Sequence, residues 1–192
     1  MARTKEFDPE VALQRALELF WERGYEATST AELVAHLGVA RASIYATFGD
    51  KRRLYLKALE RYLRITDESV VGVLSAGPAL AGVHRLIDRY AEKAAADAER
   101  VGCMVVNAAV ESSSRDAEVH RLVESSWSFL EASLTSALAR ARAEGDLPAD
   151  REPRALARML LVFFQGIQVM GRAPADADRI RDAAAQMRAL LG

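Results

Sequence analysis

Apolar residues recur at helical spacing along the whole chain, and no long segment shows the alternation of a half-buried strand. The first predicted helix opens at Asp8-Pro9, a capping residue followed by a proline, and closes at Gly24. Between these limits the apolar positions follow the order i, i+3, i+4 and i+7. The pattern predicts an all-α protein.

Glycine and proline divide the later part of the chain into further predicted helices. A long connector helix is expected after Asp50, and Gly77-Pro78 ends it. Further breaks fall near Gly102, after Gly145 and at Pro174. The helices expected from Lys51 onward cover residues 51–74, 79–95, 104–112, 116–143, 152–171 and 177–191.

Between the first helix and the connector helix, the sequence predicts two short helices joined by a tight turn. Ser29 and Glu32 fit a capping box at the start of the first, and Gly38 suits the left-handed conformation that ends it. The second is expected over residues 41–47, with Ile44 and Phe48 pointing inward because they lie four residues apart. Such a unit can place one helix in the major groove of DNA.

The outward face of the second short helix carries residues that can contact DNA. Ala42 and Ser43 are small enough to approach base edges, Arg41 can donate to guanine or phosphate, and Tyr45 carries a hydroxyl on a rigid arm. Ser43 and Thr47 can each donate or accept a hydrogen bond. Asp50 is expected to cap the connector helix, whose first turn, with Lys51, would hold a phosphate. The alternative is a plain three-helix cluster with charged solvent faces.

The segment from Phe7 to Tyr62 resembles the DNA-binding domain of the TetR/AcrR family of transcriptional regulators. The residues that carry the resemblance are Ala16, Phe20, Gly24, Tyr25, Thr28, Leu33, Gly38, Val39, Ser43, Ile44, Tyr45, Phe48, Lys51 and Leu54. The resemblance implies that residues 41–47 form the recognition helix and that Tyr45 and Lys51 anchor the DNA backbone. It also implies phosphate contacts from Thr28 and Thr30. The set of candidate DNA-binding residues is Thr28, Thr30, Arg41, Ala42, Ser43, Tyr45, Thr47 and Lys51.

Two domains follow from this interpretation. Residues 1–50 are expected to form a helix-turn-helix domain, extended by the start of a connector helix over 51–74. Residues 75–192 are expected to bind a ligand and to dimerise. The last two helices carry apolar residues over a wide arc, which suggests pairing with a second copy, and a palindromic operator needs a two-fold protein. The candidate interface residues are Leu156, Leu160, Phe164, Ile180, Met187 and Leu191. Alternatively, both helices complete a monomeric core.

The family resemblance also implies a pocket for an unknown small-molecule effector among the middle helices. The candidate lining residues are His84, Tyr90, Cys103, Met104, Asn107, Glu111, Trp127, Leu130, Phe163 and Gln168. For each, the alternative is core packing, a bond to backbone or a solvated side chain. Cys103 opens a helix after Gly102, so it is either a sensor thiol that is oxidised or alkylated, or a small packing residue.

Composition excludes several classes of protein. The net charge is −1, but residues 1–64 carry 11 Lys and Arg against 9 Asp and Glu, so the basic excess lies on the expected DNA-reading part. No apolar run is long enough to cross a membrane, no signal peptide is expected at the start of the sequence, and a cytoplasmic protein is predicted. A glycine-rich phosphate loop, a metal cluster and a nucleophile motif are all missing from the sequence, so we expect no enzyme, cofactor or metal.

These patterns together predict a homodimeric transcriptional regulator, most simply a ligand-responsive repressor that binds double-stranded operator DNA. An activator of the same family is an alternative. A second alternative is a helical small-molecule binding protein that keeps a vestigial helix-turn-helix.

Overall fold

Helices make up all the regular structure of the described residues, which confirms the fold class predicted from the spacing of apolar positions. The structure, a computed structural model, describes residues 7–173 and 176–192. Pro174, where a break was predicted, lies outside these residues. Within them the elements are α1 (Pro9–Arg23), α2 (Thr30–Leu37), α3 (Arg41–Phe48), α4 (Lys51–Ser75), α5 (Ala79–Ala95), α6 (Met104–Glu111), α7 (Ala117–Glu144), α8 (Pro153–Arg172) and α9 (Ala177–Leu191).

Local capping chemistry fixes the start of the early helices where the sequence predicted it. At α2, the Ser29 side chain accepts from the backbone N–H of Glu32, and the Glu32 carboxylate accepts from the backbone N–H of Ser29. At α4, Asp50 Oδ1 accepts from the backbone N–H of Arg53 at 2.8 Å. Gly38 ends α2 in the left-handed conformation, with φ of 65°.

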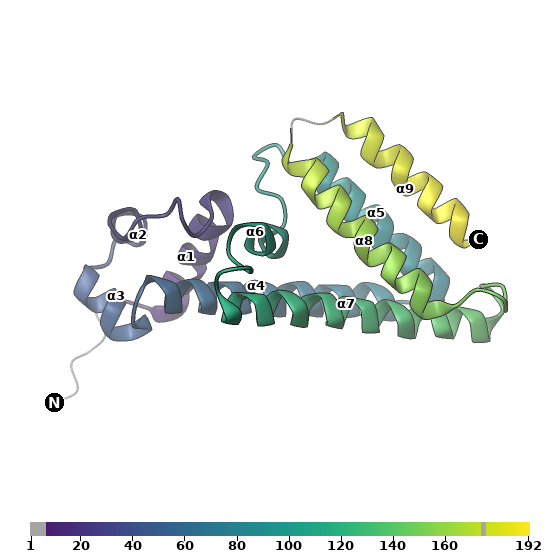
Figure 1. Ribbon diagram of the computed structural model, residues 1–192, viewed down its shortest axis with the longest axis horizontal. Coiled ribbons are helices and arrows are strands. Elements are labelled where there is room, and N and C mark those ends of the chain that lie inside the picture. Colours follow the sequence, from purple (N-terminus) through teal and green to yellow (C-terminus); the bar gives the residue numbers. More distant parts are fainter. Residues whose placement is uncertain (1–6, 174–175) are drawn as a thin grey trace.

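The helices form an elongated molecule with α1–α3 at one end and α5, α8 and α9 at the other (Figure 1). The two long helices α4 and α7 run side by side along its length and connect the ends. The short helix α6 lies between the two groups. The helices α4, α6 and α7 therefore connect the two ends of the molecule.

Two apolar cores occupy the two ends of the molecule. The core at the C-terminal end joins α5, α8 and α9 to the later turns of α4 and α7, with Leu134, Leu160 and Phe164 fully buried. The other core joins α1–α3 to the first half of α4, and it also takes in Met104 of α6 and Val119 of α7. The division at residues 50 and 75 stays a prediction, but α6 and the start of α7 pack with the helices that precede residue 50.

Four of the six residues predicted for the dimer interface belong to the core of their own subunit, so that prediction is wrong for them. The side chains of Leu160, Phe164, Ile180 and Leu191 are at most 3% exposed. They point inward because α8 and α9 each bury one face against α5 in the core of the subunit. Leu156 and Met187 are half-buried.

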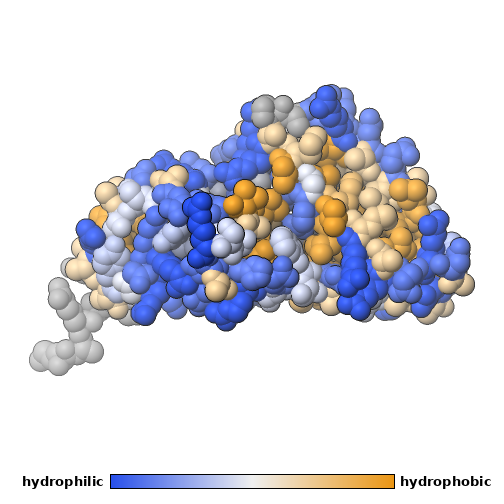
Figure 2. All heavy atoms as spheres, viewed as in Figure 1, coloured by the Kyte–Doolittle hydropathy of each residue, from blue (hydrophilic) through white to orange (hydrophobic). Residues whose placement is uncertain are grey.

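A different set of apolar side chains lies on the outside of α8 and α9. Met159, Val162 and Val169 are exposed on α8, and Leu190 is exposed on α9. Figure 2 shows apolar residues gathered over this end of the molecule, while the end that holds α1–α3 is largely hydrophilic on the same face. We call these four residues the outer stripe.

The close approach of α8 to α5 gives a test of the fold. A Cβ atom at Gly171 would lie 2.9 Å from both the Cβ and the carbonyl oxygen of Ala94. We therefore expect Gly171→Ala to lower the free energy of unfolding by about 1–3 kcal/mol in urea titrations. The control is Gly72→Ala in α4, where nothing lies within 4 Å, and it should raise stability by up to about 1 kcal/mol. Equal effects of the two substitutions would contradict the observed packing.

Candidate functional site

Two buried residues of α3 determine which face of the helix points outward. Ile44 and Phe48 are buried in the N-terminal core, as the four-residue spacing predicted. Arg41 and Ala42 are consequently exposed, and Ser43 and Thr47 are partly exposed. Figure 1 places α3 at the extreme end of the molecule, where a duplex can approach without meeting the C-terminal helices.

A hydrogen bond between α2 and α3 positions the predicted tyrosine. The Tyr45 hydroxyl lies 3.1 Å from Thr30 Oγ1, and either oxygen can donate. The Arg41 guanidinium lies 5.3 Å from the centre of the Tyr45 ring, within the range of a cation–π contact. The hydrogen bond to Thr30 lowers the pKa of Tyr45. Three of the predicted DNA-binding residues therefore form one cluster across both short helices.

Thr28 does not belong to that surface, so the phosphate contact predicted for it is wrong. The residue is 0% exposed, and its hydroxyl donates to the carbonyl oxygen of Gly24 at 2.7 Å. The hydroxyl thus closes the turn between α1 and α2. Lys51 is half-buried at the first position of α4, and its Nζ lies 4.2 Å from the centre of the Tyr25 ring.

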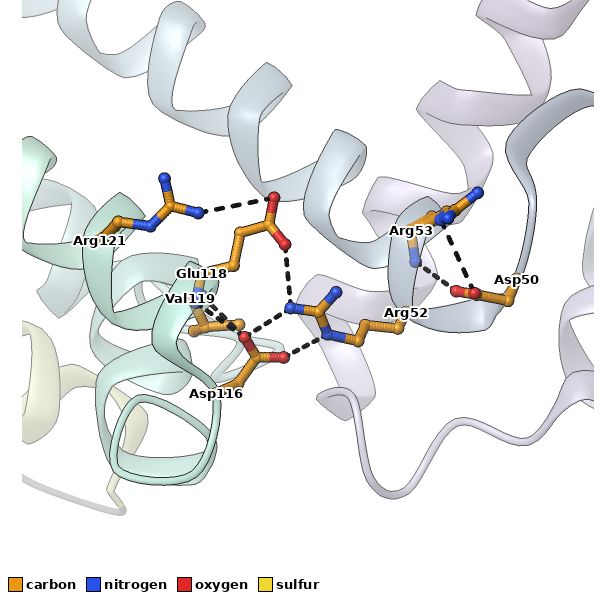
Figure 3. A network of polar contacts seen from close by, with 7 residues as sticks. All are labelled: Asp50, Arg52, Arg53, Asp116, Glu118, Val119 and Arg121. Atoms are coloured by element: carbon orange, nitrogen blue, oxygen red, sulfur yellow. Dashed lines mark hydrogen bonds and ion pairs between the residues drawn. The ribbon is translucent and has the colours of Figure 1, made fainter.

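The neighbouring arginine of α4, Arg52, is exposed but is held by α7. Arg52 donates from Nε to Asp116 Oδ2 at 2.6 Å and from Nη2 to Asp116 Oδ1 at 2.8 Å, a bidentate pair (Figure 3). Its Nη2 also lies 3.0 Å from Glu118 Oε2. Asp116 at the same time accepts backbone bonds at the start of α7. The hydrogen bonds from Arg52 lower the pKa of Asp116. We call this group the α4–α7 clasp.

Glu111 forms a second link of this kind, and with Asn107 and Gln168 it also lines a cavity of about 500 Å³, as predicted for a pocket residue. Its carboxylate accepts from the backbone N–H groups of Tyr25 and Glu26, at 3.0 and 2.8 Å. Gly24 precedes them with φ of 86°, and a Cβ there would lie 3.0 Å from the Glu111 oxygens. The end of α6 is therefore fastened to the turn after α1, at a position where only glycine fits without strain.

A third link joins α1 to the loop before α6. The Trp21 indole N–H donates to the carbonyl oxygen of Gly102 at 2.9 Å. No local sequence pattern indicates this bond of Trp21 or the Arg52–Asp116 pair. Asp116 could be recognised as a helix cap, but its arginine lies 64 residues away along the chain and no local pattern connects them.

A cavity of about 310 Å³ lies where α1, α4, α5 and α8 meet, and we call it the junction cavity. Of the predicted pocket residues it contains Tyr90, Cys103 and Gln168. The Cys103 sulfur accepts a hydrogen bond from the Tyr62 hydroxyl at 3.6 Å. The sensor role of Cys103 stays a prediction. Residues that line the cavity and were not predicted are Gln14, Leu17, Trp21, Tyr62, Ile65, Thr66, Ser69, Val70, Leu86, Arg89 and Lys93.

Among the remaining predicted pocket residues, Asn107 lines the same cavity as Glu111 and Gln168, and the others lie elsewhere. Met104 and Leu130 are buried in the two cores, and Trp127 and Phe163 pack against them. The Asn107 amide donates to the carbonyl oxygen of Val101 at 3.0 Å, so it bonds to backbone. Burial and, to a smaller degree, Arg188 lower the pKa of His84. The structure does not bring these five residues and His84 together into one pocket.

Neither a metal cluster nor a membrane span occurs in the part of the chain that the structure describes. Three or more His, Cys, Asp or Glu side chains do not meet there in an arrangement that could bind a metal ion. No described helix combines the length and the apolar character needed to cross a bilayer.

Comparison with known proteins finds family matches for both the N-terminal and the C-terminal part of the chain. Residues 12–58 match the family described as bacterial regulatory proteins, tetR family, and residues 79–187 match the tetracyclin repressor-like C-terminal domain. The uncharacterized HTH-type transcriptional regulator YezE of Bacillus subtilis is 38% identical over 184 residues, which cover 95% of each chain. The HTH-type transcriptional repressor ComR of Escherichia coli is 28% identical, over 93% of this chain and 86% of ComR.

A solved structure matches the whole fold. It is a cysteine mutant of the TetR family transcriptional regulator CifR, complexed with 26-base-pair double-strand operator DNA. The TM-score is 0.88, the sequence identity is 28%, and the match covers 100% of both chains.

The clasp predicts a specific dependence of stability on pH. The pKa of Asp116 is lower in the folded state than its ordinary value of about 4. Above about pH 4 the ion pair of Asp116 therefore stabilises the fold fully. This stabilisation is lost as the pH falls through the folded-state pKa. Asp116→Asn keeps a capping side chain but removes the charge. We expect the variant to be less stable than the wild type at pH 7, and the difference to shrink below about pH 4.

Urea titrations between pH 2 and pH 7 measure this difference. Asp150→Asn is the matched control, because Asp150 is exposed and makes no ion pair with the described residues. A constant difference between Asp116→Asn and the wild type across this range would contradict the clasp.

Proposed function

The chain belongs to the TetR family of bacterial regulatory proteins and is a DNA-binding transcriptional regulator, and we propose that it is a repressor that releases a palindromic operator when a small effector binds. The observation that carries the proposal is the outward face of α3, with Arg41 and Ser43 free to meet bases beside the Thr30–Tyr45 pair. A repressor among the relatives, ComR, and an operator complex of a protein with the same fold support it.

In the proposed complex, α3 lies in the major groove and its flanking residues hold the backbone. Arg41, Ala42, Ser43 and Thr47 would face base edges. Tyr45, Thr30 and Lys51 would meet phosphates, which fix the position of the helix but carry no sequence information. Lys51 is half-buried, and the contact of its Nζ with the Tyr25 ring restricts its position at the first turn of α4.

We propose that a second copy covers the outer stripe. Met159, Val162, Val169 and Leu190 form an apolar surface on the last two helices that the subunit itself leaves exposed. A two-fold pairing through these helices would present two α3 helices to the two halves of a palindromic site.

Release of DNA requires that an effector binds better to a dimer whose α3 helices are wrongly spaced. The α4–α7 clasp and the Glu111 link would carry such a change, because both connect the N-terminal helices to the rest of the subunit. YezE and ComR are both described as transcriptional regulators, which supports a regulatory role for this chain.

The DNA contacts are tested with duplexes recovered by selection from a random library. Arg41→Ala should remove about 1–3 kcal/mol of discrimination between the selected site and a scrambled duplex. Lys51→Ala should weaken binding to both duplexes alike, and it should reduce the slope of log K against log salt by about one per subunit.

The charge-matched control is Arg142→Ala, at the end of α7 that lies far from α3 (Figure 1). It should leave selectivity and salt slope unchanged. An Arg142→Ala variant that loses as much affinity as Lys51→Ala would show that binding is diffuse attraction and not recognition by α3.

The proposed interface is tested by introducing a charge into the outer stripe. Val162 is 71% exposed at the middle of α8, and Val162→Asp should convert the dimer to a monomer because an unpaired carboxylate would be buried. The control, Val110→Asp, changes a side chain on α6 that is 82% exposed and outside the stripe, and it should stay dimeric. Light scattering after size exclusion measures the mass, and a dimeric Val162→Asp protein would refute the interface.

A further inference from the structure

The junction cavity is shared between the N-terminal helices and the C-terminal helices. Leu17 and Trp21 bring α1 into its wall, Tyr90 comes from α5, and Gln168 comes from α8. Its volume of about 310 Å³ is within the range of cavities that hold small organic ligands. An occupant would therefore touch α1 directly, in the same unit as the recognition helix.

The charged residues that line the junction cavity are all cationic. Arg89 and Lys93 lie four residues apart on α5, so they share one face of the helix, and both are exposed. No Asp or Glu is among the described residues that line the cavity. Lys93 Nζ also lies 5.0 Å from the centre of the Trp21 ring. This edge of the cavity favours an anionic group.

An amide side chain lies in the same wall. Gln168 of α8 is 5% exposed and lines both the junction cavity and a neighbouring one. Gln168 can both donate and accept, which matches a carboxylate or a neighbouring hydroxyl on a ligand.

The rest of the wall is aromatic and apolar. The Trp21 and Tyr62 rings meet edge to face at 5.1 Å, and the Tyr90 ring stacks on Phe164 at 4.3 Å, which fixes its orientation. The aliphatic side chains of Leu17, Val70 and Leu86 complete the wall. Flat conjugated rings pack well against such walls.

We propose that the junction cavity binds a small aromatic carboxylate, of one or two rings, as the effector of the regulator. The ring system would lie among Trp21, Tyr62 and Tyr90, and the carboxylate would face Arg89 and Lys93. This assignment rests on the proposed function, because it names the ligand class of the proposed effector site. Binding against Trp21 would act on α1, and through its bond to Gly102 on the start of α6.

Calorimetric titration of the full-length protein with 2-naphthoate and with the uncharged 2-naphthamide tests the ligand class. We expect the carboxylate to bind about tenfold more tightly, equivalent to about 1.4 kcal/mol, from two exposed charge contacts. An Arg89→Gln, Lys93→Gln double variant should bind both compounds alike. Lys57→Gln is the matched control, because Lys57 is an exposed cation on α4 outside the cavity, and it should keep the tenfold preference.

Further outcomes separate this inference from the proposed function. Failure of 2-naphthoate to bind, or equal binding of the amide to the wild type, would overturn the ligand class even if the protein binds its selected duplex. Loss of the preference in Lys57→Gln would also overturn it, because the effect would then be one of overall charge. Absence of selective DNA binding without any ligand would instead refute the proposed regulator. Circular dichroism of each variant confirms that the fold is intact.

Discussion

The function of this protein depends on how firmly its small N-terminal helices are fixed to the rest of the subunit. Helices of eight residues are too short to be stable alone, so α2 and α3 take their position from α1 and α4. The bidentate Arg52–Asp116 pair then ties the first turn of α4 to the first turn of α7. Because Asp116 also caps α7, one carboxylate fixes the start of one helix and the position of another.

Glu111 and Trp21 extend this attachment to α6. One carboxylate accepts two backbone N–H groups of the turn after α1, and the indole donates to the backbone just before α6. Together with the clasp, these bonds surround a shared apolar core, so that α1–α3, α6 and the start of α7 pack as one unit. The bonds of Glu111 and Trp21 therefore connect both ends of α6 to α1 and the turn that follows it.

The two faces of α8 and α9 have different roles, because only one of them is buried within the subunit. The inward faces of α8 and α9 complete the core of the subunit, and the outer stripe remains for a partner. On the side of α8 that meets α5, Gln168 reaches the junction cavity while Gly171 permits close contact with Ala94. The same helix thus contributes to the core, to the proposed effector site and to the proposed interface.

The sequence by itself determined the helices, their caps and the outward face of α3. These features depend on residues within one or two turns, as in the Ser29–Glu32 box and the Ile44–Phe48 pair. Only the tertiary structure decided which polar side chains already have hydrogen-bond partners within the subunit. Glu111 is bonded 86 residues away along the chain, and four apolar residues expected at an interface were needed for the core. A local pattern shows that a side chain must be buried or bonded, but the packing of distant helices selects the partner.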